Sequence, residues 1–140
     1  MIILDTNIIS VLVTPDHPDL TIIETWKQTS ADQDIRVNAV SLAEIAYGVA
    51  ILPEGARKQR LAQAARTLFT ATAQTALPFG SQAAQAYGTI MSKRRSLGRP
   101  MSQFDAQIAA IAHVAGATIA TRNTRDFTGC GVPLVDPYAT

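Results

Sequence analysis

Short apolar runs alternate along the chain with longer stretches in which apolar residues recur every three or four positions. The short runs are rich in Val and Ile or bounded by Gly and Pro, which is typical of buried strands. They cover five segments: Met1–Leu4, Arg36–Val40, Ala76–Phe79, Ala117–Ala120 and Val132–Val135. Because predicted strands alternate with predicted helices, the pattern indicates the α/β class, with helices packed around a parallel sheet.

The longer stretches have the spacing of amphipathic helices. Three of them show apolar stripes, which begin at Leu20, at Leu42 and at Ile108. Two others, Gln59–Ala73 and Gln82–Ser96, are rich in Ala and carry basic faces. Pro100 disfavours helix at the residue before it, and Gly116 suits the end of the helix that follows.

Composition limits the class of protein. The chain has 140 residues, 47% hydrophobic and 16% charged, so we expect one domain over residues 1–140 with its own core. A single cysteine, Cys130, excludes a disulfide framework and suits a reducing compartment. No apolar run approaches the ~18 residues of a membrane span, and the first apolar run is too short for a signal peptide. We therefore expect a cytoplasmic protein.

The net charge of +1 hides an asymmetry between the two parts of the chain. Residues 1–54 carry eight acids and two bases, whereas residues 55–140 carry ten bases and three acids. Such asymmetry indicates an anionic partner. The basic side chains that we expect to contact a nucleic-acid backbone are Lys93, Arg94, Arg95, Arg99, Arg122 and Arg125.

Three tetrapeptides place an acid three residues after a capping residue. They begin at Ser41, Ser102 and Asn123 and end at Glu44, Asp105 and Asp126. Each is typical of a helix start, in which the cap stabilises the helix by ~1 kcal/mol. Helix capping alone is therefore one interpretation of these acids.

The geometry of a parallel sheet favours a second interpretation. Helices that follow parallel strands begin at the carboxyl edge of the sheet, where ligands bind. Asp5 ends the first predicted strand, and Glu44 and Asp126 follow two others, so we expect them at this edge; if Asp105 joins them, four carboxylates converge. Their repulsion calls for a cation, and oxygen-only ligands favour Mg²⁺ or Mn²⁺. Such a site suits phosphodiester cleavage by a metal-activated water.

Four motifs follow one another along the chain: Met1-Ile-Ile-Leu-Asp5-Thr6-Asn7, Ser41-x-x-Glu44, Gly98-Arg99-Pro100 leading to Asp105-Ala-x-Ile-Ala-Ala110, and Thr121-Arg-Asn-x-x-Asp126-Phe127. In this order they resemble the motifs of PIN-domain proteins of the VapC/FitB type. Their separations fit the whole chain. The resemblance implies a three-layer α/β/α fold with a central parallel sheet. It also implies the toxin of a type II toxin–antitoxin system, a Mg²⁺- or Mn²⁺-dependent endoribonuclease.

By matching position, the resemblance implies roles for particular residues. Asp5, Glu44 and Asp105 would be the core acids, and either Asp126 or Asn123 would complete the metal site. The polar residues expected to hold the acids or a water are Thr6, Asn7, Thr121 and Asn123. The implied partners are a VapB/FitA-like antitoxin, an RNA substrate, a second copy of the chain and, through the antitoxin alone, operator DNA.

Two other functions remain open at the level of sequence. The chain could be a catalytically weak dimeric scaffold of an antitoxin-dependent repressor, because it has no DNA-reading motif of its own. Alternatively, it could be a phosphohydrolase with Asp5 as nucleophile, although such enzymes carry a second acid where this chain has Asn7. The two histidines, His17 and His113, support no catalytic triad.

Overall fold

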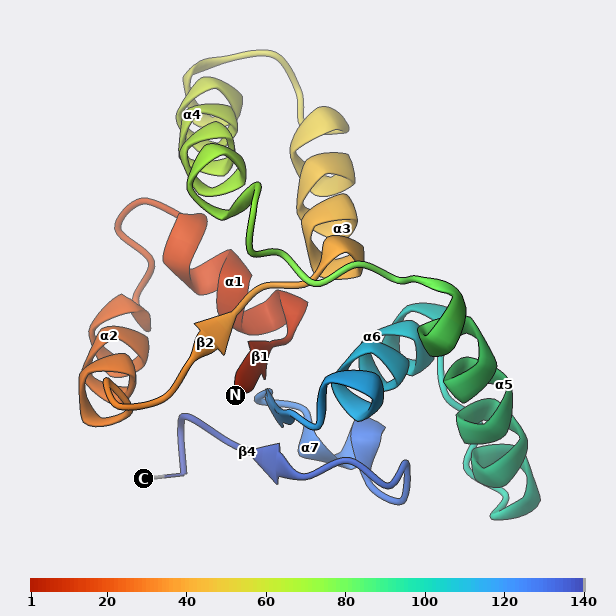
Figure 1. Ribbon diagram of the computed structural model, residues 1–140. Helices are drawn as coiled ribbons and strands as arrows, with labels where there is room; N and C mark the ends of the chain where they lie inside the picture. Colours follow the sequence, from red (N-terminus) through yellow and green to blue (C-terminus); the bar gives the residue numbers. More distant parts are fainter. Residues whose placement is uncertain (140) are drawn as a thin grey trace.

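A computed structural model of the chain, which describes residues 1–139, shows three layers (Figure 1). The central layer is a sheet of four parallel strands in the order β2-β1-β3-β4. The strands are β1 (Ile2–Leu4), β2 (Ile35–Arg36), β3 (Thr118–Ala120) and β4 (Leu134–Val135). In register, Ile3 lies beside Ile119 of β3, and Ile2 lies beside Ile35 of β2. The predicted α/β/α architecture with a parallel sheet is confirmed.

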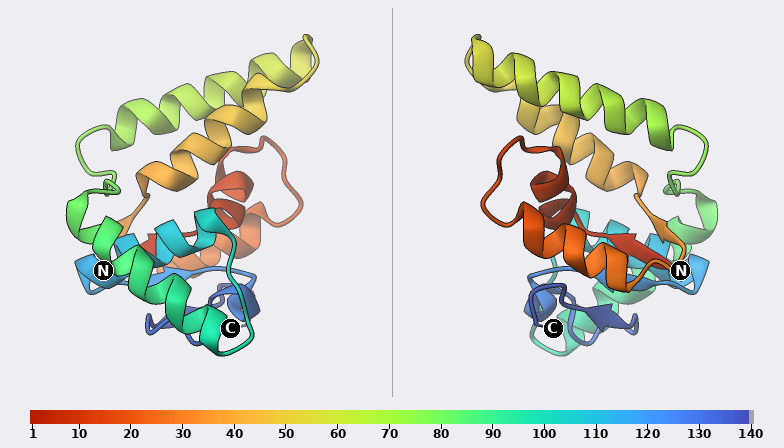
Figure 2. Two further views of the ribbon diagram at one scale, coloured as in Figure 1. Left: turned by 90° about the vertical axis from the view of Figure 1, so that its right-hand side faces the viewer. Right: turned by 90° about the vertical axis from the view of Figure 1, so that its left-hand side faces the viewer.

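Seven helices surround the sheet within the described residues. They are α1 (Thr6–Val13), α2 (Leu20–Thr29), α3 (Ala39–Ala50), α4 (Ala56–Thr72), α5 (Ser81–Ser96), α6 (Gln103–Ala115) and α7 (Thr124–Phe127). Figure 2 shows α3 and α4 as a pair that extends away from the sheet. None of the helices in residues 1–139 is long and apolar enough to cross a bilayer.

The hydrophobic core has two parts because alternate residues of a strand point to opposite faces. Ile3 and Ile119 face α5 and α6, where the small residues of α6 allow close packing. Ile2 and Leu4 face the other way, toward Ile23 and other apolar side chains of α1 to α4. The sheet is therefore buried on both faces, as its apolar strands predict.

Some of the predicted elements are wrong in detail. Helix α3 already begins at Ala39, so Val40 is helical and β2 ends at Arg36. The Ala76–Phe79 segment forms no strand; only Leu77 makes a single parallel bridge, to Asn38. Asn38 starts α3, because its side chain accepts a hydrogen bond from the Ser41 N–H. Since the chain is helical from Ala39 onward, the segment after Leu77 has no neighbouring strand there to pair with.

Helix α1 is absent from the predicted elements, and its sequence is rich in β-branched residues, which have low helix propensity. The Asp5 side chain caps it by accepting a hydrogen bond from the Thr6 N–H at 2.8 Å. Two predicted boundaries are confirmed. Gly116 ends α6 in the left-handed conformation at φ 63°, and α5 stops at Ser96, just before the Gly98–Pro100 break.

Candidate functional site

Asp5 lies at the carboxyl end of the central strand β1 and is 5% exposed. Its Oδ2 accepts hydrogen bonds from the Thr121 hydroxyl at 2.8 Å and from the Asn7 side-chain amide at 3.1 Å. Its Oδ1 accepts from the Thr6 N–H. Three predicted supporting residues, Thr6, Asn7 and Thr121, therefore do surround this carboxylate, and they come from two elements far apart in the sequence.

The pKa of Asp5 is raised to about 6, mainly by burial; the hydrogen bonds from Thr121 and Thr6 oppose the rise, and the nearby charges of Asp105 and Glu44 add to it. In the described part of the chain, Asp5 forms no ion pair with a basic side chain. Its negative charge is thus held by neutral donors alone, facing two other carboxylates. A buried carboxylate in this state is one that a cation would stabilise.

Glu44 is held by a polar network that begins at the end of β1. The fully buried Asn38 amide donates to the Leu4 carbonyl at 3.1 Å and to the Ser41 hydroxyl at 3.0 Å. Ser41 and Thr6 hydroxyls lie 2.9 Å apart, and the Thr6 hydroxyl donates to Glu44 Oε1 at 2.7 Å. The network fixes Glu44 beside the start of α1. Ser41 lies in the first turn of α3 rather than at its N-cap, so the prediction of a cap at Ser41 is wrong.

Asp105 and Asp126 complete a row of acids. Asp105 lies in the first turn of α6, whose N-cap is Ser102 as predicted, with the Asp105 N–H donating to the Ser102 hydroxyl at 3.1 Å. Burial, and then the charge of Asp126, raise the pKa of Asp105 above its ordinary value. Asp126 is exposed on α7. Electrostatic neighbours therefore run from Glu44 through Asp5 and Asp105 to Asp126.

The acids form a row rather than a closed cage. Among residues 1–139, no three His, Cys, Asp or Glu side chains lie close enough together to hold a metal ion between them. Mg²⁺ binds through one or two carboxylates and keeps several waters, so it does not need such a cage. The all-oxygen donors and the uncompensated charge of Asp5 fit this ion.

Asn123 is placed near the acids but holds none of them by its side chain. Its backbone N–H donates to the Thr121 hydroxyl at 3.0 Å, and the residue precedes α7 without a side-chain capping bond. The capping interaction predicted for Asn123 is therefore wrong. Its part in the site is to orient Thr121, which in turn holds Asp5.

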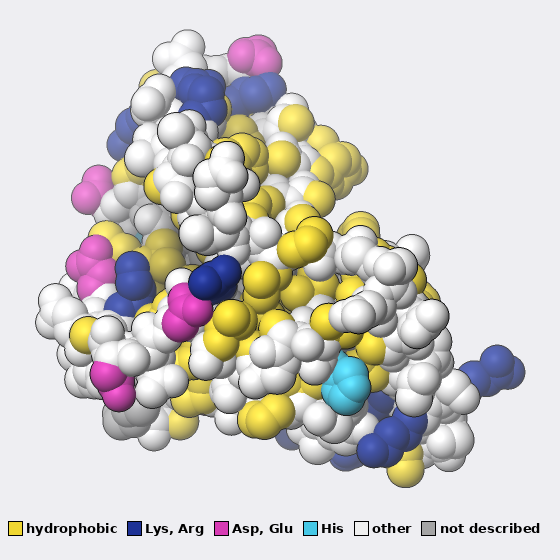
Figure 3. Space-filling view, in the orientation of Figure 1, with side chains coloured by type: hydrophobic (Ala, Val, Ile, Leu, Met, Phe, Trp, Pro, Cys, Tyr) yellow, Lys and Arg dark blue, Asp and Glu magenta, His cyan; other side chains and the backbone are white. Residues whose placement is uncertain are grey.

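The basic side chains divide into three groups. Lys93, Arg95, Arg99 and Arg125 are exposed, and Figure 3 shows basic side chains gathered over the C-terminal end of α5. Arg122 is also exposed, but it pairs with Asp19 at 3.3 Å and lies 4.4 Å from the centre of the Tyr138 ring. Arg94 is 5% exposed and bonded to three backbone carbonyls, so its prediction as an RNA contact is wrong.

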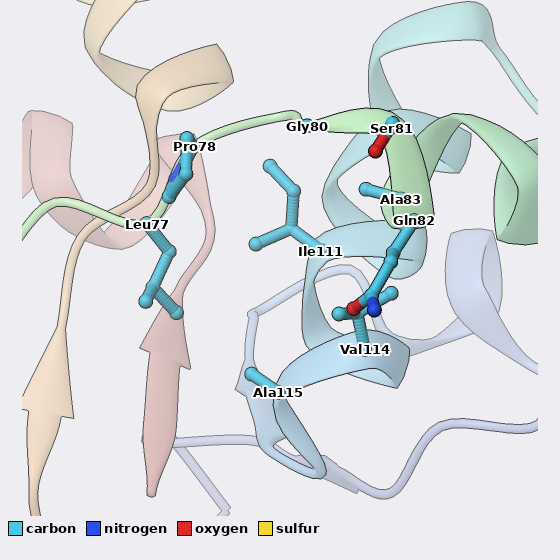
Figure 4. Close-up of a pocket in the computed structure, with 9 residues that line it drawn as sticks. All are labelled: Leu77, Pro78, Gly80, Ser81, Gln82, Ala83, Ile111, Val114 and Ala115. Atoms are coloured by element: carbon cyan, nitrogen blue, oxygen red, sulfur yellow. The ribbon is translucent and has the colours of Figure 1, made fainter.

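Two pockets differ in their relation to the acids. The apolar pocket in Figure 4 is lined by Leu77, Pro78 and residues 80–83, and by Ile111, Val114 and Ala115 toward the C-terminal end of α6. Asp105 lies at the other end of this helix, roughly 15 Å away at 1.5 Å per residue. A second pocket begins at Thr6 and Glu44 and runs between α1, α3 and α4 to Arg57. Only the second adjoins the candidate site.

The pH dependence of stability tests the burial of Asp5. Its raised pKa means that the folded state favours the protonated acid, so its contribution to stability is present below pH ~4 and is lost as pH rises through about 6. Without a divalent cation, we expect the wild type to lose up to ~3 kcal/mol more across this range than Asp5→Asn. Urea denaturation of both proteins at pH 4.5 and 7.0 should show about 2 kcal/mol of this difference, because the rest is already lost below pH 4.5. If the free energy of unfolding changed equally with pH in the wild type and in Asp5→Asn, the raised pKa of Asp5 would be contradicted.

Comparison with known proteins places the whole chain in one group. A family model described as "PIN domain" matches residues 2–129. The chain is 34% identical over 142 residues to Toxin FitB of Neisseria gonorrhoeae, covering 99% of each. It is 30% identical over 139 residues to VapC ribonuclease Y4jK of Sinorhizobium fredii, covering 99% of this chain and 98% of that protein. A solved structure of FitAB bound to an IR36 DNA fragment has a chain with TM-score 0.89 and 30% identity, covering 100% of this chain and 97% of that one.

Proposed function

Because the chain belongs to the PIN-domain family and is of the VapC/FitB type, we propose that it is the toxin of a type II toxin–antitoxin pair and acts as a metal-dependent endoribonuclease. The observation that carries the proposal is the buried Asp5 carboxylate, which faces Glu44 and Asp105 and forms no ion pair with a basic side chain of residues 1–139. The similarity to a VapC ribonuclease over nearly the whole chain supports the same reaction class.

Asp5, Glu44 and Asp105 would hold Mg²⁺ or Mn²⁺, with Asp126 at the open end of the row. When bound, the ion supplies a water of lowered pKa as nucleophile and neutralises charge on the leaving oxygen. Asp126 is the better fourth ligand than Asn123, because its charge acts on Asp105 while the Asn123 backbone is bonded to Thr121. We therefore propose Asp126, rather than Asn123, as the residue that completes the metal site.

The remaining residues orient these acids and bind the substrate. Thr121 and Asn7 hold Asp5, and Thr6 holds Glu44, so both carboxylates are fixed before substrate arrives. Such orientation of ligands by neighbouring hydrogen bonds typically changes metal affinity or activity 10–100-fold. The exposed side chains that would contact RNA phosphates are Lys93, Arg95, Arg99 and Arg125, with Arg122 available if it leaves Asp19.

The proposed partners follow from the relatives. FitAB is a complex and is bound to DNA in the solved structure, which supports a FitA/VapB-like antitoxin, a homodimer and operator binding through the antitoxin for this chain. The pocket between α1, α3 and α4 adjoins Thr6 and Glu44, so a protein bound there would cover the site. A repressor role of such a complex is therefore compatible with catalysis by this chain.

The structure offers no support for Asp5 as a phosphohydrolase nucleophile. Both oxygens of this side chain accept hydrogen bonds, and Asn7 donates one of them instead of providing a second acid.

Metal removal is the direct test of the proposed activity. Purified protein, free of antitoxin, should cut total cellular RNA into discrete fragments with Mn²⁺ or Mg²⁺, and EDTA should abolish cutting because the acids cannot activate water without the ion. Excess Mn²⁺ added after EDTA should restore the same fragments, as seen on a denaturing gel. Fragments of unchanged yield in EDTA would refute the metal-dependent mechanism.

A further inference from the structure

Arg94 is a buried charged residue for which the proposed chemistry has no use. It lies in the last turn of α5 and is 5% exposed. Within residues 1–139 it takes part in no ion pair. A charged side chain this deeply buried needs an explanation, because removing a guanidinium from water carries a penalty of several kcal/mol.

Three backbone carbonyls accept hydrogen bonds from the Arg94 guanidinium. Its Nε donates to the Arg99 carbonyl at 2.6 Å, and its Nη1 donates to the carbonyls of Asp126 at 3.0 Å and Thr128 at 2.7 Å. None of these carbonyls belongs to α5, so Arg94 does not cap its own helix. The carbonyls of Asp126 and Thr128 lie at the end of α7, where helical carbonyls lack partners within the helix.

The two segments that Arg94 joins each lead to an acid of the candidate site. Arg99 lies in the turn between α5 and α6, three residues before Ser102, which caps the helix carrying Asp105. The other bonded carbonyl belongs to Asp126 itself. In a protein interior, an apolar side chain of similar size is often as stabilising as a buried charge. Stability of the fold alone therefore does not explain why residue 94 is an arginine.

We propose that Arg94 is a positioning residue that ties the turn before Asp105 to the α7 segment carrying Asp126, and so sets the placement of these two carboxylates. The catalytic consequence rests on the proposed function; the structural tie does not. One side chain thus supports the outer half of the acid row through its three bonds to backbone carbonyls.

The test compares Arg94→Lys and Arg94→Met with Ile90→Ala. Lysine keeps the charge and most of the volume but lacks the forked donors, so it is the variant expected to fold. Ile90 is buried one helical turn earlier on α5, so Ile90→Ala weakens the same packing while keeping the three carbonyl bonds. Hydrogen exchange of residues 97–105 and 124–130, calorimetric binding of Mn²⁺ alone, and steady-state RNA cleavage are measured for each protein.

We expect Arg94→Lys to speed hydrogen exchange in both segments, to weaken Mn²⁺ binding about tenfold, and to lower kcat about ten- to a hundredfold with KM nearly unchanged. Ile90→Ala should lower Tm while leaving both segments and kcat close to the wild type. Wild-type exchange in either segment of Arg94→Lys, or equal changes in Ile90→Ala, would overturn the proposal. If the wild type cuts no RNA, the proposed function fails, while exchange still decides the role of Arg94.

Discussion

Asp105→Asn is expected to lower kcat for RNA cleavage by at least about a thousandfold, or ~4 kcal/mol of transition-state stabilisation. The change removes the central charge of the acid row and leaves a nearly identical shape. Because burial and Asp126 both disfavour the ionised form of Asp105, the neutral amide should leave Tm unchanged or slightly higher. Loss of activity without loss of stability is the signature of a residue selected for chemistry.

The measurement pairs single-turnover RNA cleavage with thermal denaturation of the same samples. Asp32→Asn is the matched control, because it removes one negative charge from an exposed loop position outside the site. Its cleavage rate should stay within about twofold of the wild type, since Asp32 lies in the loop before β2 and salt screens exposed charges that are outside the site. Near wild-type cleavage by Asp105→Asn would instead favour a scaffold whose acids only cap helices.

Asn38→Ala is expected to cause the largest loss of stability among the variants considered, about 3–5 kcal/mol. The substitution removes the bond from the Ser41 N–H that caps α3, which contributes ~1 kcal/mol. It also leaves the buried Leu4 carbonyl and Ser41 hydroxyl without the Asn38 amide, at about 1–3 kcal/mol each. Asn38 is fully buried, so water cannot replace its bonds. For a domain of this size Tm should fall by about 10–15 °C.

Ser102→Ala provides the comparison for that result, because it also removes a helix N-cap, but an exposed one. It should lower stability by only about 1 kcal/mol in urea denaturation. Equal losses in the two variants would show that the buried network from Leu4 to Glu44 adds nothing to the cap. A larger loss in Asn38→Ala would show that the residue supports the whole network.

The fold was predictable where local patterns carry the information. The short apolar run before Asp5 predicts a buried strand, and the apolar stripe of α6 predicts a helix with one buried face. Predictions failed at α1 and at Leu77. Helix α1 is rich in β-branched residues, and it is stabilised by packing against α2, α3 and α4 and by the Asp5 cap. The segment around Leu77 pairs at a single residue, which no periodicity can reveal.

The candidate site was predictable in its residue types and only partly in its arrangement. The spacing of caps and acids identified Glu44, Asp105 and Asp126, and the strand end identified Asp5. The bonds that orient these acids join residues far apart in the chain, such as Thr121 to Asp5 and Thr6 to Glu44. Asn38 was missed because the predicted strand Arg36–Val40 includes it; a capping residue type inside an apolar run was the available signal.

By itself, the sequence determined the α/β class, the parallel sheet and the set of acids, because strand and helix periodicity and helix caps are local properties of the chain. The tertiary structure alone decided that Arg94 is buried rather than offered to RNA, and that the acids form a row instead of a cage. Burial depends on which distant segments pack over a side chain. A run such as Lys93-Arg94-Arg95 looks uniform in sequence, yet α7 covers only its middle residue.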